Sequence, residues 1–157
     1  MLQSYNKEQA ILRINRLSEQ GKEFVFIIDY LQDCSYIEET NRLDSSFVLY
    51  NLNGFTNQDS IFPLRKTAVQ WNIDFPPFDQ YKPSFDYVLE NIRGGNSFLT
   101  NLTCRTLITT NLSLKEIFYH SKAMYKLWLK DAFVVFSPEI FVRIKGRKIY
   151  SYPMKAL

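Results

Sequence analysis

Short runs of apolar residues, rich in β-branched and aromatic side chains, recur along this 157-residue chain and are separated by residues that favour turns. Such runs are typical of β-strands, because branched and flat side chains pack well on a pleated surface. We therefore expect strands at residues 24–28, 47–52, 69–75, 97–108, 133–136, 141–144 and 148–152. The polar residues 38–41 predict a loop.

The pattern inside some of these runs indicates how the strand is buried. Residues 24–28 are apolar without interruption, which predicts a strand buried on both faces. At residues 69–75 apolar and polar residues alternate, which predicts one face in a core. Asn53-Gly54 tolerates positive φ and predicts a tight turn after the strand at 47–52. Lys145-Gly146 predicts the turn between the last two strands.

A helix is predicted near the N-terminus, where Asn6 and Gln9 have the spacing of a capping box. Gly21 predicts the end of this helix. Its buried stripe is expected to consist of four apolar residues at helical spacing, namely Ala10, Ile11, Ile14 and Leu17.

Two further helices are predicted. Pro83 suits a first helical turn, and the helix it opens is expected to end at Gly94-Gly95. Its apolar face consists of Phe85, Val88, Leu89 and Ile92. Ser113 and Glu116 form a second capping-box pattern, ahead of an expected buried stripe of Ile117, Ser121, Met124 and Trp128.

Strands interrupted by three helices favour an α+β fold with a mostly antiparallel sheet and three flanking helices. A hydrophobic content of 46% is enough for one core, so we expect a single domain over residues 1–157.

The composition argues against several classes of partner. The 19 basic and 16 acidic residues are spread along the chain, without the basic block expected for nucleic-acid binding. The sequence contains no apolar run of about 20 residues, as a membrane span needs, and no signal-peptide pattern, so we expect no membrane partner and a cytoplasmic location. Cys34 and Cys104 are expected to be separate thiols, and the lone His120 is assigned no role.

Three segments, in order, carry a resemblance to a known family. Residues 94–103 resemble the pattern G-D-x-[FY]-Q-x-N-L-[ST], residues 136–143 resemble a strand followed by S-P-E-x-[FL], and residues 149–155 resemble a strand leading into P-[IL]-[KA]-G-T. In the first segment Asn96 and Leu99 stand where Asp and Gln are usual, while the matches are Gly95, Phe98, Asn101, Leu102 and Thr103. Together they resemble the chorismate-binding enzymes, which include anthranilate synthase and aminodeoxychorismate synthase.

The resemblance implies a function through Lys155. At this position aminodeoxychorismate synthase component I carries lysine, whereas anthranilate and isochorismate synthases usually carry alanine. The chain therefore resembles aminodeoxychorismate synthase component I here. It implies that Lys155 is a catalytic nucleophile that attacks the chorismate ring and must be neutral to do so. It also implies Mg²⁺ as cofactor of the complete enzyme, chorismate as substrate, and a glutaminase subunit that supplies ammonia for 4-amino-4-deoxychorismate, on the route to p-aminobenzoate and folate.

The resemblance also leads us to expect an incomplete half of the anthranilate synthase component I-like fold, an N-terminal fragment that is inactive alone and holds no cofactor. Ala156-Leu157 replaces the family's Gly-Thr. Such a half would leave sheet edges bare, so we expect a homodimer or a complementing C-terminal half. The alternative is a non-catalytic binding or assembly module derived from the same fold.

Overall fold

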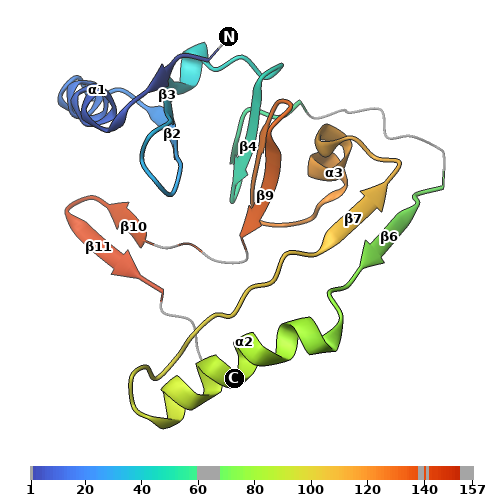
Figure 1. The fold of residues 1–157 in the computed structure, drawn as a ribbon. Coiled ribbons are helices and arrows are strands. Elements are labelled where there is room, and N and C mark those ends of the chain that lie inside the picture. The colour runs from blue at the N-terminus through green and yellow to red at the C-terminus, as the bar shows by residue number, and fades with distance from the viewer. Residues whose placement is uncertain (1, 60–67, 138–139, 141, 153–157) are drawn as a thin grey trace. The chain divides into compact units, whose positions relative to one another are not determined.

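The computed structural model describes residues 2–59, 68–137, 140 and 142–152. The chain forms two compact units, one made of Met1–Leu64 with Leu114–Leu157 and the other of Arg65–Ser113. Among the described residues every paired strand is antiparallel and three α-helices occur, so the predicted α+β fold is confirmed (Figure 1). The expectation of one domain over residues 1–157 stays a prediction.

The first sheet of the larger unit has the order β1-β3-β2, with β1 at Ser4–Tyr5, β2 at Phe24–Ile28 and β3 at Ser35–Glu39. The loop predicted at 38–41 is therefore wrong in its first half, because Glu38 and Glu39 belong to β3 and only Thr40–Arg42 leaves the strand, as the short 3-10 helix η1. Glu39 is buried, yet its carboxylate lies 3.9 Å from Lys22 Nζ and 3.6 Å from an Arg42 nitrogen. This pairing offsets part of the cost of burying the Glu39 carboxylate.

Helix α1 (Lys7–Glu19) begins where the sequence predicts. The Gln9 backbone N–H donates to Asn6 Oδ1 at 3.0 Å, and the Asn6 backbone N–H donates to Gln9 Oε1 at 3.1 Å. The capping box is thus confirmed. Gly21 follows the helix with a φ of 62°, the left-handed conformation that glycine adopts at low cost.

One face of the first sheet packs against α1. Ala10 and Leu17 form a cluster with Ile37 of β3, and Ile14 packs beside them. Ile11 is 51% exposed, so the predicted buried stripe is wrong at this residue. The helix packs on β3 and β1, which leaves Phe26 and Ile28 of β2 exposed. The prediction that β2 is buried on both faces is therefore wrong within the part of the chain described.

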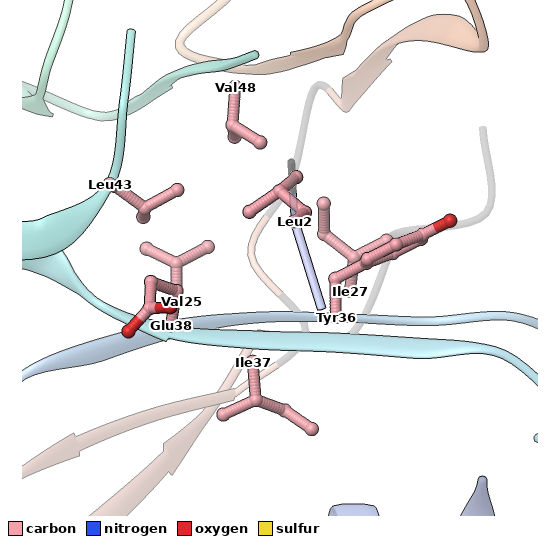
Figure 2. A pocket seen from close by; sticks show the side chains of 8 residues that line it. All are labelled: Leu2, Val25, Ile27, Tyr36, Ile37, Glu38, Leu43 and Val48. Carbon is pink, nitrogen blue, oxygen red and sulfur yellow. The ribbon is translucent and has the colours of Figure 1, made fainter. Parts of the chain in front are cut away.

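The opposite face of this sheet carries the side chains of Val25, Ile27, Tyr36 and Glu38 (Figure 2). They lie near Leu2, Leu43 and Val48 around a cavity of ≈ 10 Å³, whereas Ile37 points to the other side of the strands. A cavity of this size holds about one water molecule at most. This region is packed core rather than a ligand site.

The second sheet of the larger unit has the order β5-β4-β8-β9. Its strands are β4 (Val48–Leu52), β5 (Phe55–Thr56), β8 (Tyr125–Leu129) and β9 (Phe133–Ser137). The predicted turn between β4 and β5 is confirmed: Asn53 and Gly54 have φ values of 53° and 93°, as a two-residue hairpin turn requires.

Helix α3 (Leu114–His120) packs on this second sheet. Phe118 is fully buried against Leu49 of β4 and Trp128 of β8. The predicted helical stripe through Met124 and Trp128 is wrong, because the helix ends at His120 and Trp128 is a strand residue. The spacing of these apolar residues fits a helix. The chain, however, leaves α3 after His120, and Trp128 packs against Phe118 from strand β8.

Lys126 of β8 joins the sheet to the end of α3. Its Nζ donates to the carbonyl oxygens of Phe118 and Ser121, each at 2.9 Å, and lies 4.5 Å from the centre of the Phe118 ring. Burial lowers the pKa of Lys126 from its ordinary value. The carbonyls at a helix C-terminus are suitable partners for a cation, so this lysine holds α3 in place.

The smaller unit contains β6 (Trp71–Asp74), α2 (Phe78–Arg93) and β7 (Leu107–Thr110), with β6 and β7 paired. Helix α2 begins five residues before Pro83, so the predicted start is wrong; the ring's fixed φ fits a helix, and the proline removes a single backbone donor. The strand predicted at 97–108 is wrong over residues 97–106, because β7 includes only its last two residues, Leu107 and Ile108. Trp71 and Ile73 are 44% and 43% exposed, so the expected buried face of β6 is also wrong within the described residues.

None of the helices in the described ranges is long and apolar enough to cross a membrane.

Replacing Asn6 with alanine should lower the free energy of unfolding by about 1 kcal/mol, because the Gln9 backbone N–H then loses its acceptor at the start of α1. Urea denaturation followed by circular dichroism measures this. Gln3→Ala, an exposed change before the helix, is the control, and an equal loss in both variants would contradict the capping role.

Replacing Lys126 with methionine should lower the free energy of unfolding by about 1–3 kcal/mol, since two carbonyl oxygens at the end of α3 lose their donor. The control is Lys122→Met, because Lys122 is exposed and lies in the same segment. Equal unfolding midpoints for the Lys126→Met and wild-type chains would show that the lysine does not hold α3.

Candidate functional site

The first of the three family-like segments, residues 94–103, lies in the smaller unit. Gly94 caps α2, and Gly95 has a φ of 78°. The backbone N–H of Asn96 donates to the Asn91 carbonyl oxygen at 2.9 Å, and its side chain donates to Asn91 Oδ1 at the same distance. These contacts close the helix, as the sequence predicts for Gly94-Gly95. Phe98, which matches the family pattern, is 96% exposed.

The second and third segments belong to a hairpin in the larger unit. Strand β10 (Val142–Lys145) pairs with β11 (Lys148–Ser151), as predicted, and Gly146 lies in the turn with a φ of 61°. Lys155, the predicted nucleophile, lies outside the described residues, as do Pro138 and Glu139 of the second segment.

The two faces of this hairpin differ in character. Opposed residues share a face, so Val142 opposite Ser151 and Ile144 opposite Ile149 form an apolar face. The other face has Arg143 opposite Tyr150 and Lys145 opposite Lys148. Ile144 and Ile149 are 68% and 71% exposed. The hairpin therefore presents one apolar face and one basic face.

A hollow of ≈ 500 Å³ lies beside β10, and we call it the β10 hollow. It is lined by residues of the second sheet, the Asn53 turn and the hairpin: Leu52, Asn53, Phe55, Tyr125, Ile140, Val142 and Arg143. It combines apolar side chains with a guanidinium, an amide and a phenol. Sites for small organic molecules commonly have this mixed composition, and a guanidinium suits a carboxylate. The sequence predicts a turn at Asn53 but does not mark Asn53 or Tyr125 as site residues, because the two come from segments far apart in the chain.

Two tyrosines of the sheets have a raised pKa because of their surroundings in the fold. Hydrogen bonding to Cys34, followed by burial, raises the pKa of Tyr36. Burial, followed by the charge of Glu23, raises the pKa of Tyr50. Cys34 and Cys104 are both free cysteines. Among the described residues no three His, Cys, Asp or Glu side chains are grouped as a metal site requires.

Comparison with known proteins assigns the chain to a family. The family model for chorismate binding enzyme matches residues 30–156. The chain belongs to the chorismate-binding enzyme family. The match includes the β10–β11 hairpin and the segment containing Lys155, so the resemblance predicted from three short motifs is confirmed.

Two curated relatives cover almost the whole chain. A Haemophilus influenzae protein named "Uncharacterized PabA-like protein" is 37% identical over 148 residues, which are 94% of this chain and 44% of that protein. A Pasteurella multocida protein, also named as an uncharacterised PabA-like protein, is 35% identical over 156 residues, 92% of this chain and 45% of that protein. The chain thus spans less than half the length of either relative. No solved structure matches it significantly.

Proposed function

We propose that this chain is part of an aminodeoxychorismate synthase component I, which converts chorismate and ammonia to 4-amino-4-deoxychorismate. The observation that carries the proposal is Lys155, within the family match and four residues after the end of β11. The name PabA-like, carried by both relatives, supports a function related to aminodeoxychorismate synthase.

In the proposed reaction the neutral amine of Lys155 forms a C–N bond to the chorismate ring, and the 4-hydroxyl leaves and takes up a proton to become water. Ammonia from a glutaminase partner then forms a C–N bond at the 4-position, and the bond to the lysine breaks, which returns the free amine. A lysine with a pKa near 10.4 is almost fully protonated at neutral pH, so the complete site has to lower this value by desolvation or nearby positive charge.

The β10 hollow is our candidate for part of the substrate site. Chorismate is a ring with two carboxylates, and the hollow has apolar walls together with Arg143. An arginine pairs with a carboxylate through two parallel hydrogen bonds, which fixes orientation as well as charge.

Mg²⁺ belongs to the proposal for the complete enzyme. It prefers carboxylate oxygen ligands, and among the described residues no three His, Cys, Asp or Glu side chains are grouped. We therefore assign no metal ligand in the described part of this chain, and we propose a complementing polypeptide as the source of the metal site and of the acid and base groups.

The test joins this chain to the part of the Haemophilus influenzae relative that it does not match. With chorismate, ammonia and Mg²⁺, the chain alone should give no product and the joined protein should form 4-amino-4-deoxychorismate. Lys155→Ala in the joined protein should reduce turnover by about 100-fold or more, since a nucleophile is lost, whereas Lys148→Ala should change it by less than about threefold. Equal activity of the two variants would refute the role of Lys155.

A second candidate is a non-catalytic assembly module. The exposed apolar face of the β10–β11 hairpin favours it, because such faces commonly mark contacts between proteins. This function predicts that calorimetry detects no chorismate binding and that light scattering at micromolar concentration gives the mass of a homodimer. A monomeric mass would contradict the homodimer, and measurable chorismate binding would contradict the module.

A further inference from the structure

A second hollow of the larger unit lies between the edge strands of its two sheets. Strand β2 ends the order β1-β3-β2, and β9 ends the order β5-β4-β8-β9. The hollow between them measures ≈ 580 Å³, and we call it the β2–β9 hollow. The described residues that line it are all apolar: Phe26, Ile27, Ile28, Leu127, Phe133, Val134 and Val135.

Both edges have sequences typical of central strands. Strand β2 reads Phe-Val-Phe-Ile-Ile and β9 reads Phe-Val-Val-Phe-Ser, without a charge or a proline in either. Natural edge strands are commonly protected by charged residues, prolines or bulges, because an unprotected edge pairs with other chains. Continuous apolar strands are normally covered on both sides. The two sequences therefore fit the interior of a larger sheet.

The exposure of the side chains agrees with this reading. Phe26 and Ile28 of β2 are 55% and 45% exposed, and Val135 of β9 is 49% exposed. Covering these half-exposed side chains would remove their remaining apolar surface from water, which favours association.

The relatives indicate what covers the hollow. The chain corresponds to 44% and 45% of their lengths, so more than half of each relative has no counterpart here. We propose that the β2–β9 hollow docks an apolar β-strand from a polypeptide equivalent to that unmatched part, paired through backbone hydrogen bonds with the outer edges of β2 and β9. The inference rests on family membership and not on the proposed reaction, so it can hold even if Lys155 has no catalytic role.

The experiment mixes the full chain with the unmatched part of the Haemophilus influenzae relative, without chorismate, and measures complex formation by light scattering and calorimetry. A one-to-one complex is expected. Ile28→Lys and Val135→Lys should each weaken it by about tenfold or more, because a lysine at the seam loses its water. Leu12→Lys is the matched control, since Leu12 is 69% exposed on α1, and it should weaken the complex by less than about twofold.

Thermal unfolding identifies any lysine variant that no longer folds. For such a position the threonine variant is used instead, because threonine fits a strand and still removes apolar contact. Absence of a complex would overturn the proposal, as would equal weakening by all three variants. A self-dimer that the Ile28 and Val135 variants disrupt, with no binding of the relative's segment, would identify a second copy as the occupant and overturn it too.

Discussion

The pairing of β4 with β8 holds the larger unit together. Val48 lies opposite Leu129 and Leu49 opposite Trp128, so two segments on either side of the smaller unit form one ladder. Closing so long a loop costs conformational entropy, which the buried side chains on both faces of this ladder offset. Leu49 and Trp128 pack with Phe118 on one face, and Val48 reaches the first sheet on the other.

Two surfaces of the larger unit explain where function and assembly can be located. Beside β4 and β8, the Asn53 turn and the β10–β11 hairpin form the β10 hollow, whose described lining combines Arg143 with apolar residues. At the other edge, β9 and β2 present strands that lack the protection of ordinary edges. The docking strand that we propose for these edges comes from a polypeptide equivalent to the unmatched part of the relatives.

Elements that depend only on neighbouring residues are predictable from the sequence, whereas elements that depend on contacts between distant segments are not. Asn6 with Gln9 and Asn53-Gly54 depend on neighbouring residues alone, and both predictions are confirmed. The spacing of Trp128 from Ser121 and Met124 predicts a helix, whereas its burial comes from the long-range ladder with β4. The β10 hollow joins distant segments, so no spacing reveals it. The role of Lys155 came from resemblance and stays a prediction.

Amide hydrogen exchange in the chain alone tests the central claim, that the β4–β8 ladder is the stable centre and that β2 and β9 are interior strands without their neighbours. The slowest exchange should occur in β4 and β8 at similar rates, with clearly faster exchange at the outward-facing amides of β2 and β9. Protection of β2 and β9 equal to that of β4 and β8, in a chain that light scattering shows to be monomeric, would contradict it.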